Sequence, residues 1–221
     1  MVPKERMDSV LESVEMLLYR DYGPLVLYPA YTVPNAEIGY LTRYAPGVRE
    51  NGGLYTHAGV WAIQMECFLK RGEKAWEIFK KFCPVDRGMD PLKYLCEPYV
   101  TAGNVDGPDS PYYGRGGWTW YTGSAAWLYR IMMEWIIGVR PEWEGLRIAP
   151  CVPKSWSRFN TRRIYRERSY EMEFERDKSL SAGEVRIYSG KSLLGAEGLL
   201  PLKASLHFPK GQPILLKVSF N

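Results

Sequence analysis

The sequence predicts an α+β fold in which a helical part is followed by a smaller part made of antiparallel strands. Apolar residues recur at helical spacing in the first part of the chain, whereas short segments of alternating polar and apolar residues, bounded by Gly, Pro and Asp, fill its end. A proline-punctuated connection from Val139 to Trp156 lies between them. We therefore expect two domains, residues 1–138 and residues 139–221.

Four helices are expected in the first domain. Apolar spacing predicts a helix from Glu5 to Arg20, a second that begins at Thr56, a third from Glu73 to Phe82, and a fourth from Thr122 to about Ile137. The second and fourth helices each follow a long loop rich in Gly, Pro and aromatic residues. Helix pairs whose loops gather at one end are typical of an α/α toroid.

The second domain is expected to be a small antiparallel β-sandwich. Period-two alternation indicates its strands. The segments are Thr161 to Phe174, Glu184 to Tyr188, Ala204 to Phe208 and Ile214 to Phe220.

Composition excludes several classes of function. The chain has 221 residues and a net charge of only +4, with its basic residues scattered, so no nucleic-acid partner is expected. No apolar run is long enough to span a bilayer, and Met1 to Tyr22 lacks the apolar centre of a signal peptide, so we expect no membrane contact and a cytoplasmic location. The four widely spaced cysteines predict buried free thiols and no metal site.

The segment GRGGWTWYTGSAAW, from Gly114 to Trp127, combines features of a ligand site. Thr122 and Gly123 open a helix, where the dipole and free backbone N–H groups favour an anion. The chain also holds 8 Trp and 16 Tyr, side chains whose faces pack on sugar rings as well as in protein cores. Taken alone, the segment is also compatible with an ordinary capped helix that has a buried aromatic face.

Four motifs together carry a family resemblance. They are TRYAPGVRENGGLYTHAGVW (Thr42 to Trp61), EPYV (Glu97 to Val100), RGGWTWYTGSAAW (Arg115 to Trp127) and IIGVRPEWEGLRIAPCVPKSW (Ile136 to Trp156). In this order and spacing the chain resembles the C-terminal part of the family 94 glycoside phosphorylases. That family includes cellobiose, chitobiose and β-1,2-oligoglucan phosphorylases and the phosphorylase-like end of cyclic β-1,2-glucan synthases.

The resemblance implies an inverting phosphorolysis of a β-glucoside, on the last part of an (α/α)6 barrel followed by a jelly-roll-like β-domain. Inorganic phosphate is the co-substrate and the nucleophile, so the site needs one carboxylic acid and no cofactor. The family's general acid lies upstream of every motif found here. We therefore expect a fragment or subunit of a glycosyltransferase-type enzyme that is inactive alone, and that pairs with an N-terminal phosphorylase portion or with itself.

Three residues are implied to bind phosphate. His57 matches the family's phosphate-binding histidine, and Thr122 with the backbone of Gly123 matches its second phosphate contact. Both positions fall in the first turn of an expected helix, so two dipoles and two hydrogen-bonding groups could converge on one dianion.

Four further residues are implied to contact the sugar. Arg49 and Glu50 match the basic and acidic pair that binds the donor glucose, although the family often has lysine in place of Arg49. Arg43 and Tyr44 lie in the loop that approaches the sugar. Gly103 stands where cellobiose enzymes carry glutamine, which favours a β-1,2-linked glucan.

The expected ligands are a β-glucan oligosaccharide and phosphate or glucose 1-phosphate. Two other functions stay open. The chain could be a non-catalytic carbohydrate-binding or scaffolding module whose aromatic loops hold glucan. It could also be a hydrolase that uses Glu50 with Asp106 or Asp109 as a pair of carboxylates.

Overall fold

The computed structural model describes residues 3–195, 197–209 and 211–221, and it combines helices and sheets as an α+β protein. The chain forms two compact units. Unit 1 comprises the residues up to Glu66 together with Trp76–Tyr129. Unit 2 comprises Cys67–Ala75 and Arg130–Asn221.

The four helices expected from apolar spacing are all present. They are α1 (Lys4–Leu17), α2 (Thr56–Phe68), α3 (Gly72–Phe82) and α6 (Thr122–Ile131), the last continued by a π-helical segment, η2 (Met132–Ile136). In α3 the apolar residues at helical spacing form the buried side of the helix: Ile78, Phe79 and Phe82 are buried, while Lys80 is exposed.

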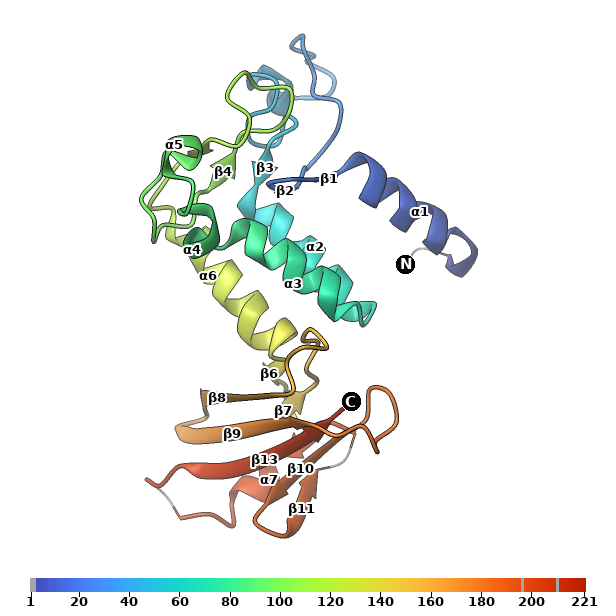
Figure 1. Ribbon diagram of the computed structural model, residues 1–221, viewed down its shortest axis with the longest axis vertical. Helices are drawn as coiled ribbons and strands as arrows, with labels where there is room; N and C mark the ends of the chain where they lie inside the picture. The colour runs from blue at the N-terminus through green and yellow to red at the C-terminus, as the bar shows by residue number, and fades with distance from the viewer. Residues whose placement is uncertain (1–2, 196, 210) are drawn as a thin grey trace. The chain divides into compact units, whose positions relative to one another are not determined.

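Short elements connect these helices within unit 1. They are β1 (Tyr19–Arg20), β2 (Gly23–Pro24), η1 (Tyr40–Arg43), β3 (Leu54–Tyr55), α4 (Pro84–Arg87), α5 (Pro91–Tyr94), β4 (Asn104–Val105) and β5 (Gly116–Gly117). Strands β3, β4 and β5 form one antiparallel sheet in that order, and β3 runs directly into α2 (Figure 1). Sequence periodicity missed this sheet, since a two-residue strand shows no alternation.

The long loops around this sheet are fixed by the carboxylate of Asp106, which is 4% exposed. Its Oδ2 atom accepts hydrogen bonds from Ser110 Oγ at 2.9 Å and from Arg115 Nη2 at 3.3 Å, and its Oδ1 atom accepts one from Asn104 Nδ2 at 3.1 Å. One buried anion therefore ties β4 to the segment that leads into β5.

The described residues of unit 2 form two sheets. One has the order β12 (Leu199–Pro201), β7 (Gly145–Ile148), β6 (Val139–Pro141). The other has the order β11 (Ser192–Gly195), β10 (Val185–Ser189), β13 (Ile214–Phe220), β9 (Arg168–Arg176), β8 (Arg158–Tyr165). Alternation along β9 and β13 buries Met172, Phe174 and Val218 on one face of the larger sheet.

Two strand predictions in unit 2 are wrong. Ala204 to Phe208 does not form a strand, because a short helix, α7 (Leu202–Ser205), occupies its start. The sheets are also not entirely antiparallel, since β13 pairs with β9 in parallel, with Ile214 opposite Tyr170. The predicted segment from Thr161 to Phe174 is a hairpin of two strands, β8 and β9.

The four cysteines, all within the described ranges, form no disulfide; Cys67 and Cys151 are buried, and Cys83 and Cys96 are half-buried. In the described ranges no group of three or more His, Cys, Asp or Glu side chains is placed to hold a metal ion. None of the described helices has both the length and the apolar character needed to cross a bilayer.

Candidate functional site

The small sheet of unit 1 brings the N-terminal ends of α2 and α6 together. Gly103, just before β4, accepts a hydrogen bond from the backbone N–H of Thr56 at 3.0 Å and donates one to the carbonyl of Trp118 at 3.2 Å. The ladder thus extends to the first residue of α2 and into the loop before α6. A Cβ atom on residue 103 would lie 3.0 Å from the Trp118 carbonyl, which explains glycine here.

His57, the second residue of α2, lies beside the first turn of α6. An ideal Cβ atom built on Gly123 would lie 2.7 Å from His57 Nε2, so the imidazole is in close contact with the helix backbone. The other ring nitrogen, Nδ1, is 3.4 Å from the hydroxyl oxygen of Ser124. Two of the three predicted phosphate-binding residues are therefore neighbours. The positive ends of two helices meet at this point.

Thr122 is the first residue of α6, and its side chain is exposed. The equivalent residue of α2, Thr56, is buried, and its hydroxyl donates a hydrogen bond to the carbonyl of Ala102 at 2.6 Å. The hydroxyl of Thr56 therefore has a structural role, since it joins the start of α2 to the segment before β4. Thr122, as an exposed residue, is accessible to a ligand.

Arg49 and Glu50, the predicted sugar-binding pair, form an ion pair with 3.4 Å between Nε and Oε2. Their side chains are only 19% and 20% exposed. Arg49 Nη1 also donates a hydrogen bond to the hydroxyl of Tyr44 at 3.0 Å. Three of the four predicted sugar-binding residues are therefore joined. Arg43, at the end of η1, is exposed, and no described contact links it to the other three.

Two aromatic residues that the sequence did not single out organise this site. The guanidinium of Arg49 lies over the indole of Trp118 at 3.7 Å from the ring centroid and over the ring of Tyr55 at 5.3 Å. Tyr55 in turn stacks on His57 with 5.7 Å between centroids. Tyr55 therefore lies between the Arg49–Glu50 pair and His57, and these residues form one continuous cluster.

The cluster requires unusual backbone conformations in its loops. Arg49 has φ of 53° and Trp118 has φ of 57°, both in the left-handed region that non-glycine residues rarely adopt. The backbone N–H of Arg49 donates to Asn104 Oδ1 at 2.7 Å, which holds this conformation. Strained residues held in this way concentrate at functional sites.

The carboxylates proposed for a hydrolase have other roles. Asp106 is fully engaged by three donors, and Asp109 Oδ2 accepts the backbone N–H of Ala30 at 3.0 Å. These contacts do not support a catalytic pair that includes Glu50.

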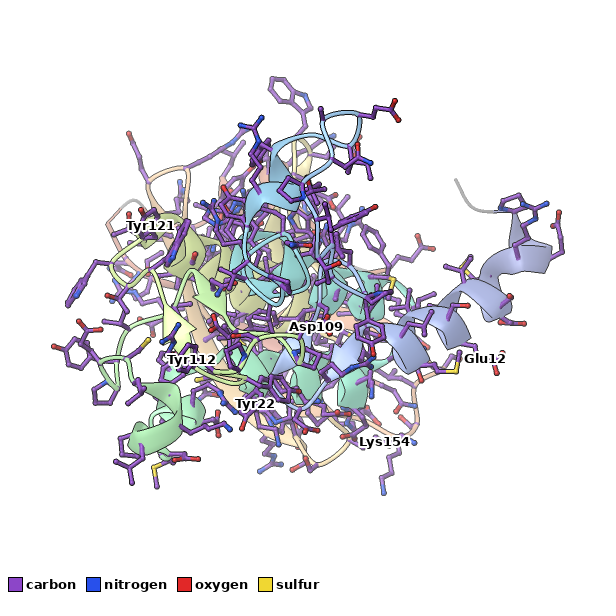
Figure 2. All side chains as sticks on the ribbon, turned by 90° about the horizontal axis from the view of Figure 1, so that it is seen from above. Glu12, Tyr22, Asp109, Tyr112, Tyr121 and Lys154 are labelled. Atoms are coloured by element: carbon purple, nitrogen blue, oxygen red, sulfur yellow. The ribbon has the colours of Figure 1, made fainter. Side chains whose placement is uncertain are left out.

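Exposed aromatic side chains are frequent in the segment that precedes α6. Trp120 is 62% exposed, and its ring meets that of Tyr99 edge to face at 6.1 Å. Tyr121 and Tyr112, both labelled in Figure 2, are 58% and 57% exposed. Such rings present apolar faces and polar edges to solvent, as carbohydrate-binding surfaces do.

Comparison with known proteins identifies the family. The sequence model described as "Glycosyl hydrolase 94 superfamily, catalytic domain" matches residues 1–138. The chain belongs to this superfamily. It is 35% identical over 193 residues to a solabiose phosphorylase of Paenibacillus borealis, across 86% of this chain. It is 36% identical over 175 residues to the cyclic β-(1,2)-glucan synthase NdvB of Rhizobium meliloti, across 78% of this chain.

A third relative is an N,N'-diacetylchitobiose phosphorylase of Vibrio proteolyticus, 31% identical over 203 residues and 91% of this chain. The matched regions cover 25% of the solabiose and diacetylchitobiose enzymes and 6% of the glucan synthase. This member of the glycosyl hydrolase 94 superfamily thus spans a quarter or less of the length of these relatives.

Proposed function

We propose that this chain is the part of an inverting β-glucoside phosphorylase that holds inorganic phosphate and one side of the donor-glucose subsite. The observation that carries the proposal is the contact between the imidazole of His57 and Gly123 at the N-terminal end of α6. The His57 imidazole, as a hydrogen-bond donor, and the positive end of α6 would then both face the space beside Gly123. This combination suits a phosphate dianion.

In the proposed reaction a phosphate oxygen forms a bond to the anomeric carbon while the bond from that carbon to the leaving sugar oxygen breaks. A carboxylic acid protonates the departing oxygen. His57, Thr122 and the Gly123 backbone would hold the nucleophile. Arg49 and Glu50 would bind hydroxyl groups of the donor glucose. We place the acid in the portion of the enzyme that precedes this chain.

The donor is proposed to be a β-linked glucoside. Relatives with different names match at comparable identity, so the comparisons do not select one glycosidic linkage. We propose a β-1,2 linkage on sequence grounds alone. The helices of unit 1 are proposed to be the last part of an (α/α)6 barrel, and the two sheets of unit 2 a jelly-roll-like sandwich. A cytoplasmic location likewise stays a prediction.

The N-terminal portion of a phosphorylase is the partner we propose. An apolar groove of about 290 Å³ between α1, β2 and α2 is lined by Val14, Leu18, Leu25 and Met65, and Trp61 beside it is 56% exposed. Neighbouring barrel helices would cover such a face. An N-terminal phosphorylase portion that is co-expressed with this chain should co-elute with it in size-exclusion chromatography. Separate elution of the two proteins would contradict the pairing.

A phosphate titration tests the proposed function. The chain has two histidines, so His57→Ala removes the proposed ligand while His207→Ala, at an exposed position of unit 2, is a matched control. Losing a hydrogen bond to a charged group costs about 2 kcal/mol, so His57→Ala should weaken binding by roughly 30-fold in calorimetry. Equal affinity for phosphate in both variants would contradict the proposal.

The second candidate function is a carbohydrate-binding module, which the exposed aromatic rings around Trp120 favour. Such a module has no need to bind phosphate. Glucan binding that survives in the His57→Ala variant, combined with the absence of phosphate binding in the unmodified chain, would favour it over the phosphorylase.

A further inference from the structure

Ser124 is the third residue of α6, and it is fully buried, with 0% exposure. Its backbone N–H donates to the carbonyl of Tyr121 at 3.0 Å. For its hydroxyl, the described structure gives one hydrogen-bond contact, with Nδ1 of His57 at 3.4 Å. A buried hydroxyl is almost always hydrogen-bonded, so Nδ1 of His57 is the described partner for the Ser124 hydroxyl.

We propose that Ser124 is a positioning residue which donates its hydroxyl proton to Nδ1 of His57 and so fixes the proton of the ring on Nε2. A neutral imidazole has one donor and one acceptor nitrogen, so if Nδ1 accepts, Nε2 carries the hydrogen. Nε2 is the atom that faces Gly123. The inference rests on the proposed function, because it assigns the direction of the hydrogen bond that His57 would make to phosphate.

The tautomer matters because the opposite one would work against an anion. With the proton on Nδ1, the lone pair of Nε2 would point towards the start of α6, where the phosphate is proposed to lie. A lone pair facing a dianion is repulsive, whereas an N–H donor to a dianion forms a charge-assisted hydrogen bond. The stacking of Tyr55 on the ring limits rotation but does not distinguish the two nitrogens.

Nitrogen NMR of the imidazole rings reads the tautomer directly. In the whole chain labelled with 15N-histidine, His207→Gln leaves only the signals of His57. Long-range 1H–15N spectra above the histidine titration range should show a protonated Nε2 and an unprotonated Nδ1. Ser124→Ala should convert this pattern to a mixture of tautomers, and Ser124→Thr, which keeps a hydroxyl, should preserve it.

Ser110→Ala is the matched control, because it also removes a buried hydroxyl from unit 1. The Ser110 hydroxyl donates to Asp106 and accepts the backbone N–H of Tyr112, and neither group contacts His57, so the His57 pattern should stay unchanged. If Ser124→Ala fails to fold, the unmodified chain and Ser124→Thr still decide the matter. A proton on Nδ1 of His57 in the unmodified chain overturns the inference without any variant.

Phosphate added to the same samples separates the two proposals. We expect Ser124→Ala to weaken phosphate binding by about tenfold, the effect of losing one oriented hydrogen bond, and Ser110→Ala to leave it unchanged. Equal affinity and an unaltered His57 tautomer in Ser124→Ala would overturn the positioning role while the phosphate site stands. A changed tautomer, with no response of His57 to phosphate in any sample, would uphold the role of Ser124 and refute the phosphate site.

Discussion

Replacing Gly123 with alanine is expected to abolish phosphate binding while leaving the free energy of unfolding nearly unchanged. The new Cβ atom would lie 2.7 Å from Nε2 and 3.0 Å from Cε1 of His57, closer than real Cβ contacts allow. The imidazole is the end of a side chain and can turn away, so the fold can absorb the clash. Gly123 is the second residue of α6, and alanine has a higher helix propensity than glycine, which offsets part of the cost of the clash.

The displaced imidazole and the added methyl group would both obstruct the volume proposed for phosphate. Gly117→Ala is the matched control, because a Cβ atom on this β5 residue would meet nothing within 4 Å. Calorimetric titration with phosphate and urea unfolding should be measured on both variants. Wild-type phosphate affinity in Gly123→Ala would show that the anion does not bind between His57 and α6.

Replacing Asp106 with alanine is expected to destabilise unit 1 by about 3 kcal/mol. The substitution leaves the buried donors of Ser110 and Asn104 without their acceptor and removes the ion pair with Arg115. The Arg115 side chain is 42% exposed and can be hydrated, so most of the cost arises from the two buried groups.

Asp109→Ala provides the comparison, because that carboxylate accepts a single backbone hydrogen bond at an exposed position. Urea unfolding followed by tryptophan fluorescence, together with hydrogen exchange across residues 103–118, should report the difference. We expect faster exchange of the β4 and β5 amides in Asp106→Ala only. Equal stability of the two variants would contradict the role given to Asp106.

Much of the helical framework was predictable because it follows from local spacing. In α3 the apolar positions recur every three or four residues, and the residue types alone mark its buried side. Helix α2 is apolar nearly all round, so its residue types do not mark the buried side, and its Trp61 is exposed. The parallel pairing of β13 with β9 was not predictable, because alternation gives the two faces of a strand but not its neighbour. The segment from Ala204 to Phe208 alternates as a strand would, but it is too short to distinguish the two-residue period of a strand from the 3.6-residue period of a helix.

The positions of the site residues at helix starts were predictable, but the aromatic contacts that connect them were not. His57 and Thr122 stand at helix starts that the sequence marks, and the structure places both there. The contacts of Trp118 with Arg49 and of Tyr55 with His57 depend on left-handed loop residues and on strands of two residues. Neither feature has a periodic signal. The run of aromatic residues from Trp118 to Tyr121 was the available indication.

An arsenate-bound crystal structure of the chain would test the central claim most directly, because arsenate has the charge and shape of phosphate and its anomalous scattering identifies it. We predict an arsenic peak within hydrogen-bond distance of His57 Nε2 and the backbone N–H of Gly123. Unit 2 contains a second place to look for the anion, a cavity of about 670 Å³ whose lining includes Lys70, Lys154 and Arg176. Arsenic in that cavity, with none beside His57, would contradict the proposed phosphate site.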